Sequence, residues 1–151
     1  MPVIHLAPLQ TRTLADLHSL GRTPRPPTWI EEVEDFIHGE GSQAVLLGRA
    51  TGILVYGDTE PIGVAILKPH DHHQGTELLQ AFLIGHEHRG RKLAKPALRA
   101  VLESPATTDR SHIVWLVHPD NAAMQIVSEA GSHAIDRGAG DDGYDLFIFD
   151  R

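Results

Sequence analysis

Residues 76–104 read TELLQAFLIGHEHRGRKLAKPALRAVLES. The apolar run from Leu78 to Ile84 predicts a β-strand, and the apolar spacing from Leu93 to Val101 predicts a helix. Between them lies a polar and basic loop, residues 86–92. A helix that begins directly after such a loop places backbone N–H groups beside fixed positive charge. The stretch therefore predicts an anion site, with phosphate as the favoured anion.

Length and composition limit the class of protein to which this loop can belong. The chain has 151 residues, of which 41% are apolar, so we expect one domain spanning residues 1–151 with its own hydrophobic core. Cysteine is absent, which excludes disulfides, a thiolate nucleophile and Cys-ligated zinc, and suits a reducing compartment. No apolar run is long enough to span a bilayer and no secretory signal is present, so we expect a cytoplasmic protein without a membrane partner. The net charge of −7 opposes wide contact with nucleic acid.

The residues before this stretch predict a strand, two helices and a hairpin. Leucines repeat every three residues from Leu14 to Leu20, and Gly21 is expected to end that helix. Three prolines follow, and Thr28 then caps a second helix that Gly39 is expected to stop. The expected elements are a strand at 3–6, helices at 11–20 and 28–38, and hairpin strands at 53–58 and 62–67, whereas residues 42–50 fit either a helix or a strand.

The residues after the stretch predict a strand, a helix and two further strands. The run from Ile113 to Val117 is almost entirely apolar, which is typical of a strand buried on both faces and predicts the centre of the sheet there. A helix is expected from Ala122 to Ala130, and final strands are expected near Ala134 and from Tyr144 to Phe149.

Residues 88–94 read HRGRKLA. They resemble the signature loop of the GNAT superfamily of acyl-CoA-dependent N-acyltransferases, which reads Gln or Arg, two variable residues, Gly, one variable residue, then Gly or Ala. Arg89 and Ala94 fit this signature, and the run is similar to a subset of the family that reads His-Arg-Gly-x-x-Leu-Gly/Ala. Lys92 departs from it, because the family has a Gly there that lets the backbone approach a phosphate closely.

Residues 117–131 read VHPDNAAMQIVSEAG and carry a second similarity to the same family. The family pattern is a strand, an Asn, an amphipathic helix and a terminal Gly, and here Asn121 and Gly131 match it. Met124 and Val127 are similar to the same subset, although the segment is one residue shorter than usual. Asn121 also suits a helix cap, a role that is compatible with contact to a cofactor.

The resemblance covers the whole chain and implies both a fold and an activity. The implied fold is α+β, a mixed and mostly antiparallel twisted sheet of six to seven strands with about four helices, splayed between the fourth and fifth strands. The implied activity is transfer of an acetyl or other acyl group from coenzyme A to a primary amine by direct attack. The cosubstrate would be acetyl-CoA or another acyl-CoA, without a metal. The acceptor would be a small-molecule or peptide amine, and a homodimer is compatible with the family.

The resemblance also implies which residues hold the cofactor. The loop amides from Arg91 to Lys95 would hold the pyrophosphate, since Pro96 has no N–H to offer. The backbone amide of Ile84 would lie near the thioester carbonyl, where charge develops during attack. The implied cofactor residues are Phe82, Leu83, Ile84, Arg89, Gly90, Arg91, Lys92, Leu93, Ala94, Lys95 and Asn121.

Catalysis requires a base for the amine and a proton donor for the departing thiolate. Many family members place a Tyr for the second task in the helix after the Asn, where this chain has Val127 and Ser128. Glu77 on the fourth strand and His118 on the fifth are the candidate bases. The candidate catalytic residues are therefore Glu77, His118 and Ser128, with Tyr144 as an alternative donor.

Two other classes of function stay open. The missing Tyr and the Lys92 departure favour a coenzyme A-binding or sensory module without turnover. The 11 histidines, with clusters at residues 70–73 and 86–88, raise a metal site, but close spacing in loops fixes no tetrahedral geometry and we expect no metal. For the acceptor, Glu31, Glu32, Glu34 and Asp35 either attract a cationic amine or simply suit the N-terminal half of a helix.

Overall fold

The chain folds around one mixed β-sheet. The computed structural model describes residues 2–69, 75–105, 112–118, 120–121, 124–125, 128, 133–136 and 144–150. Within these residues the strands are β1 (Ile4–Pro8), β2 (Thr51–Gly57), β3 (Glu60–Pro69), β4 (Thr76–Ile84), β5 (His112–Val117), β6 (His133–Asp136) and β7 (Asp145–Asp150). They lie in the order β1-β2-β3-β4-β5-β7-β6, and every neighbouring pair is antiparallel except β4 and β5.

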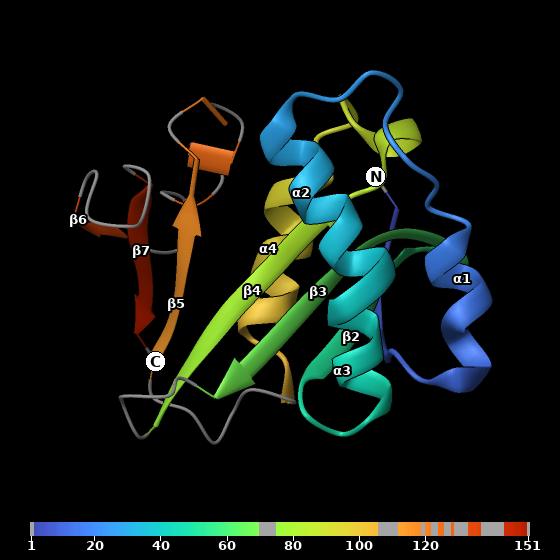
Figure 1. Ribbon diagram of the computed structural model, residues 1–151, viewed down its shortest axis with the longest axis horizontal. Coiled ribbons are helices and arrows are strands. Elements are labelled where there is room, and N and C mark those ends of the chain that lie inside the picture. The colour runs from blue at the N-terminus through green and yellow to red at the C-terminus, as the bar shows by residue number, and fades with distance from the viewer. Residues whose placement is uncertain are drawn as a thin grey trace.

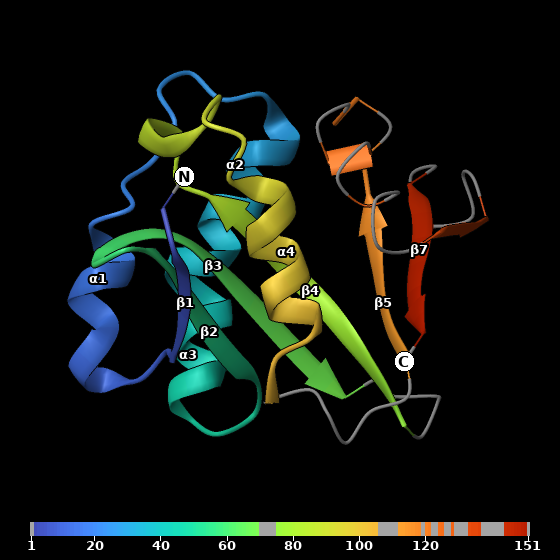
Figure 2. The same cartoon turned by 180° about the vertical axis from the view of Figure 1, so that it is seen from behind.

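Helices cover both faces of the first four strands (Figures 1 and 2). On one face lie α1 (Leu14–His18), α2 (Thr28–Phe36) and α3 (Ser42–Leu46), and on the other lies α4 (Ala94–Leu102). Short 3-10 turns occupy Thr11–Thr13 and His86–His88. None of the helices in the described residues is long and apolar enough to cross a membrane.

The two helical layers explain why β3 is buried on both faces. All residues from Ile62 to Leu67 are buried, and they divide between two apolar clusters. Ala65 and Leu67 pack in the cluster that contains α4, whereas Val64 and Ile66 pack in the cluster that contains Leu17 of α1. Because each fully buried aliphatic side chain contributes roughly 1.5–3 kcal/mol, this strand anchors both layers.

Strands β4 and β5 separate soon after they meet. Their parallel pairing covers only Thr76 to Leu78 of β4, opposite His112 to Val114 of β5. Just beyond this point the register between β3 and β4 shifts, since Ile66 pairs with Ala81 but Leu67 pairs with Leu79. The shift leaves Gln80 as the extra residue of a β-bulge, a feature that bends a strand and increases its twist. Figure 1 shows the resulting divergence of the two strands.

The fold predicted from the sequence is confirmed. The α+β sheet has the expected splay between the fourth and fifth strands, and the hairpin of β2 and β3 lies where the apolar runs placed it. Gly21 has a φ of +66°, the left-handed conformation expected where a helix ends. Of the helix predicted at 122–130, the described residues Met124, Gln125 and Ser128 are helical, and the remainder lies outside the described part of the chain.

The prediction that Gly39 ends the second helix is wrong. A π-helical turn, Ile37–Gly41, joins α2 directly to α3, so the helical path continues through both glycines. The residues that fitted either a helix or a strand therefore begin as helix α3. Gly41 does not reverse the chain, but a larger residue would not fit there, because a Cβ would lie 2.6 Å from the Phe36 ring and 2.9 Å from Ile66.

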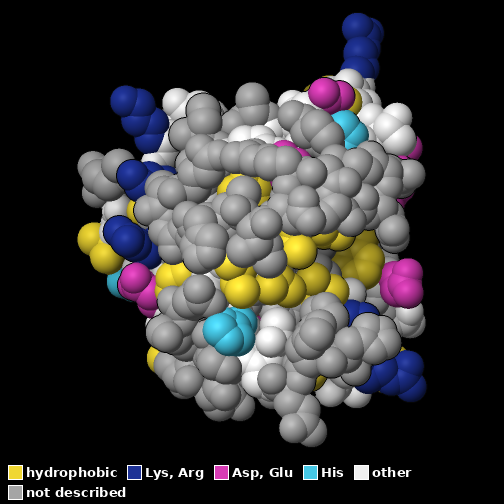
Figure 3. All heavy atoms as spheres, turned by 90° about the vertical axis from the view of Figure 1, so that its left-hand side faces the viewer, with side chains coloured by type: hydrophobic (Ala, Val, Ile, Leu, Met, Phe, Trp, Pro, Cys, Tyr) yellow, Lys and Arg dark blue, Asp and Glu magenta, His cyan; other side chains and the backbone are white. Residues whose placement is uncertain are grey.

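The prediction that β5 is the sheet centre, buried on both faces, is also wrong. β4 occupies the middle of the strand order. Ile113, Trp115 and Val117 are buried, but Leu116 is 45% exposed. The splay explains the difference, since an apolar side chain on β5 can face the opening between the strands. Figure 3, which views the molecule from the side of β7, shows hydrophobic side chains gathered in a band across that face.

We expect Gly41→Ala and Gly39→Ala to change stability in opposite directions. The first substitution forces a methyl group against Phe36 and Ile66 and should lower the free energy of unfolding by about 1–3 kcal/mol. The second meets nothing within 4 Å and should raise it by up to about 1 kcal/mol, because Ala favours a helix over Gly. Urea unfolding followed by circular dichroism measures both, and an equal effect of the two substitutions would contradict this packing.

Candidate functional site

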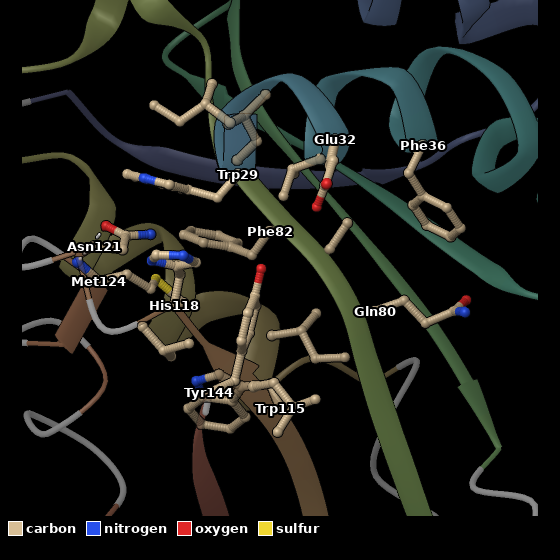
Figure 4. A pocket seen from close by; sticks show the side chains of 17 residues that line it. Trp29, Glu32, Phe36, Gln80, Phe82, Trp115, His118, Asn121, Met124 and Tyr144 are labelled. Atoms are coloured by element: carbon tan, nitrogen blue, oxygen red, sulfur yellow. Dashed lines mark hydrogen bonds between the residues drawn. The ribbon is translucent and has the colours of Figure 1, made fainter. Parts of the chain in front are cut away.

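A cavity of about 270 Å³ fills the opening between β4 and β5. Helix α2 forms one side of it, the bulged part of β4 and the end of β5 form two others, and Tyr144 closes it near β7 (Figure 4). Its described lining residues are Trp29, Ile30, Glu32, Val33, Phe36, Leu79, Gln80, Ala81, Phe82, Leu83, Trp115, Leu116, Val117, His118, Asn121, Met124 and Tyr144.

A second cavity of about 220 Å³ shares part of this lining and extends toward the start of α4. It adds Ile84, Arg89 and Ala94 to six residues of the first cavity. Six of the residues predicted to bind a cofactor therefore line one space: Phe82, Leu83, Ile84, Arg89, Ala94 and Asn121.

The edge of β4 turns backbone polar groups toward this opening. Gly85 N donates to the carbonyl oxygen of Ile62 at 2.9 Å, so Gly85 faces β3. Backbone groups alternate in direction along a strand, and those of Phe82 and Ile84 therefore face away from β3. Pairing with β5 ends at Leu78, so this edge borders the cavity. An extended ligand with amide groups could pair with it as an added strand does.

The loop before α4 adopts a backbone shape suited to glycine at two positions. Gly90 has a φ of +79° and Lys92 a φ of +59°. Lys92 thus holds the left-handed conformation at the position where the signature has Gly, although the conformation costs a non-glycine residue about 1–2 kcal/mol. Leu93 is buried and fixes the start of α4, while Arg91, Lys92 and Lys95 are exposed. The predicted anion loop therefore offers N–H groups and three accessible cations.

Arg89 instead turns its guanidinium into the protein. Its Nε donates to the carbonyl oxygen of Ile84 at 3.0 Å, and its Nη1 donates to the hydroxyl of Thr23 at 2.9 Å. That hydroxyl donates in turn to Glu34, whose carboxylate also accepts from the backbone N–H of Thr23. Burial lowers the pKa of Arg89, and the charge of Glu34 opposes this effect. Arg89 therefore joins the loop before α4 to the loop before α2, a use that its place in the signature did not predict.

His118 lies in the cavity wall between two aromatic rings. It stacks on Trp29 with centroids 5.6 Å apart and meets Tyr144 edge-on at 5.0 Å. Its Nδ1 accepts a hydrogen bond from the backbone N–H of Asp120 at 3.0 Å. We infer from this bond that neutral His118 carries its proton on Nε2, and so presents a donor rather than a base.

The other two predicted catalytic residues lie outside both cavity linings. Glu77 is buried on β4 opposite Ile113, at the end where β4 and β5 are still paired. Ser128 is 1% exposed, and its hydroxyl accepts from Trp115 Nε1 at 3.0 Å. Ser128 is thus not a cavity group but a buried partner that fixes Trp115.

Glu32 was one of four acidic residues in its helix, and only the folded chain distinguishes it. Its carboxylate points into the cavity from α2, and the hydroxyl of Tyr144 enters from the opposite side (Figure 4). Glu34 is buried on the Arg89 side and Asp35 pairs with Arg22. The helical period places Glu32, Glu34 and Asp35 on different faces of α2, but the sequence does not show which of these faces borders the cavity.

Asn121 performs the predicted helix cap and also faces the cavity. Its Oδ1 accepts from the backbone N–H of Met124 at 3.1 Å. Figure 4 shows the amide nitrogen on the cavity side.

No group of three or more His, Asp or Glu side chains suited to a metal ion occurs in the described residues. His88 is buried, with Nδ1 3.2 Å from Arg91 Nη1 and Nε2 3.8 Å from a Glu60 carboxylate oxygen. The histidines of residues 70–73 lie outside the described part of the chain.

Comparison with known proteins agrees with this architecture. The sequence model of a protein family described as an acetyltransferase (GNAT) domain matches residues 4–131. Among solved structures, an aminoglycoside acetyltransferase in complex with coenzyme A has a TM-score of 0.72 at 18% identity, with 99% of this chain and 95% of that chain covered.

Two further solved structures have the same fold. An acetyltransferase from Thermus thermophilus has a TM-score of 0.70 at 18% identity, with 100% of both chains covered. The PaiA N-acetyltransferase from Thermoplasma acidophilum, in complex with coenzyme A, has a TM-score of 0.68 at 16% identity, with 99% of both chains covered. Comparison with curated proteins gives no match.

Lys92→Gly should give a more stable protein than Lys92→Ala, by about 1 kcal/mol, because only Gly adopts the left-handed backbone without strain. Arg91 supplies the matched control. Arg91 does not have a positive φ, so Arg91→Ala should be more stable than Arg91→Gly. Urea unfolding of the four variants measures the two differences, and the same sign at both positions would contradict a strained Lys92.

Thr23→Val should lower the free energy of unfolding by about 1–3 kcal/mol, because it removes the hydroxyl between Arg89 and Glu34 and leaves buried polar groups with fewer partners. Thr28→Val is the control. The prediction that Thr28 caps α2 is wrong, because Pro27 is the N-cap and Thr28 is the exposed first residue of a helix without a side-chain cap hydrogen bond. Chemical denaturation compares the two variants, and a Thr23→Val protein as stable as the control would show that the network contributes little.

Proposed function

Because the acetyltransferase (GNAT) model matches residues 4–131, the chain belongs to the GNAT family, and we propose that it transfers an acetyl group from acetyl-CoA to a primary amine. The observation that carries the proposal is the pair of cavities that share six lining residues and lie between the start of α4 and the opening between β4 and β5. It brings an anion loop, a strand edge and a cavity for a second substrate into one site.

The residues present fit coenzyme A. The exposed cations Arg91, Lys92 and Lys95 and the N–H groups at the start of α4 suit the phosphates. The outward backbone groups of Phe82 suit the amides of the pantetheine arm, whereas the carbonyl oxygen of Ile84 already accepts from Arg89 and its N–H is the group left to a ligand. Acetyl-CoA would supply the activated acetyl group as a thioester, and the N–H of Ile84 remains the proposed donor to its carbonyl oxygen.

The cavity provides groups for the two proton transfers. The ammonium group of the bound amine must first lose one proton, and the neutral nitrogen then forms a bond to the acetyl carbon as the carbon–sulfur bond breaks. The second transfer gives a proton to the departing thiolate, while the acylated nitrogen loses its own extra proton to water. Glu32 takes the place of Glu77 as the proposed acceptor of the first proton, directly or through water, because its carboxylate enters the cavity. Tyr144 is the proposed donor of the second, and His118 Nε2–H is a donor beside it.

Purified protein should release thiol from acetyl-CoA only when a primary amine is added. Tyr144→Phe should lower kcat by about 100-fold, since it removes a proton donor and little volume. Tyr56→Phe is the matched control, because Tyr56 donates to Asp16 of α1 and lines neither cavity.

Calorimetry with coenzyme A separates the alternatives. Binding without turnover on a broad amine panel would favour a coenzyme A-binding or sensory module, a second candidate motivated by the absence of Tyr from the helix after Asn121. Absence of binding to well-folded protein would overturn the proposal.

A further inference from the structure

We propose that the acceptor is a primary amine with a single positive charge, joined by a short linker to an aromatic or other flat apolar body. This inference rests on the proposed function, because it assigns the substrate class of the same cavity. It follows from the walls of the cavity, from its charge and from the direction by which each substrate enters.

Aromatic side chains form the walls. Trp29, Phe36, Phe82, Trp115 and Tyr144 all line the cavity, and Figure 4 shows their rings around one space. Aromatic faces bind flat apolar groups through offset or edge-on contact, and they also attract a cation placed over them. A ligand body with a flat apolar surface matches such walls better than a strongly hydrated one does.

Contacts behind the walls hold these rings in place. Trp115 stacks on Phe147 with centroids 6.2 Å apart, and its indole N–H is bound by the buried Ser128. Trp29 is supported by His118, which is itself held by the backbone of Asp120. A rigid aromatic wall loses little side-chain entropy when a ligand binds, which favours a preformed pocket.

Glu32 is the one Asp, Glu, Lys or Arg side chain among the described residues that line the larger cavity. One carboxylate satisfies one ammonium group. The described lining residues offer no second carboxylate, so the further positive charges of a polyamine would have only aromatic faces as partners among them. A free amino acid would place its own carboxylate near Glu32, without a Lys or Arg among these lining residues to receive it.

The two ends of the cavity assign the direction of entry. The Asn121 end is shared with the second cavity, which leads to Ala94 at the start of α4. Gln80 and Phe36 lie at the other end, beyond Glu32 (Figure 4). The thioester would therefore enter from the Asn121 side, past Trp29 and Phe82, which line both cavities. The amine body would occupy the part lined by Phe36, Trp115 and Tyr144, which belong to the larger cavity alone, with Glu32 at the ammonium.

The test compares kcat/KM for tryptamine, 2-phenylethylamine, spermidine and glycine with saturating acetyl-CoA. The two aromatic monoamines should exceed spermidine and glycine by at least about tenfold. Robust turnover with spermidine or glycine preferred would overturn the inference and leave the proposed function intact.

Tryptamine binding in the presence of coenzyme A, measured by calorimetry, provides a readout that does not depend on turnover. Binding without acetylation would uphold the inferred ligand class and count against the proposed function. Absence of tryptamine binding from a protein that acetylates other amines would overturn the inference alone.

Glu32→Gln should raise the KM for tryptamine by about tenfold, because the variant loses the charge that faces the ammonium, and should lower kcat as well, because it also loses the proposed proton acceptor. The KM for acetyl-CoA should not change, since Glu32 does not line the second cavity. Glu31→Gln is the matched control, since Glu31 is the preceding residue of α2 and is exposed as Glu32 is, but lines neither cavity. An equal rise in KM for both variants would indicate a general effect of helix charge and would overturn the role assigned to Glu32.

Discussion

The site depends on the short parallel contact between β4 and β5. Three residue pairs join these strands, and beyond Leu78 the bulge at Gln80 turns β4 away from β5. Continued pairing would have used the outward backbone groups of Phe82 and Ile84 and would have filled the space now lined by aromatic rings. One interruption of a sheet ladder therefore creates both a strand edge that can bind amides and a cavity beside it.

An opening of this kind needs supports on each side, and the chain supplies them from distant segments. On the α2 side, the hydroxyl of Thr23 connects buried Glu34 to Arg89, so the loop before α2 and the loop before α4 share one polar network. On the β5 side, Ser128 holds Trp115. Such buried networks stabilise a structure only when their members are satisfied together, which makes the positions of the two walls interdependent.

Local patterns predicted the order of elements, because each element depends on neighbouring residues, and the family resemblance implied the splay between β4 and β5. They failed where a side chain's direction depends on the splay itself. Leu116 was expected in a closed interior, and Ser128 among the catalytic groups, because neither position can be assigned without knowing that β5 leaves β4. Arg89 was expected to face an anion, but its partner Thr23 lies 66 residues away in the sequence.

Lys92 stands where the family signature has Gly, and the structure shows how the loop accommodates this difference. The structure gives Lys92 the left-handed backbone that glycine would adopt freely, so the substitution is accommodated at a conformational cost and the loop keeps a glycine-like conformation at that position. Its exposed side chain adds a positive charge to the loop of a protein whose net charge is −7. The second departure, the missing Tyr after Asn121, has a counterpart in Tyr144, which brings a hydroxyl into the same cavity from the start of the last strand. Lys92 and the missing Tyr are therefore weak arguments for an inactive module, since the loop keeps its conformation at Lys92 and Tyr144 brings a hydroxyl into the cavity.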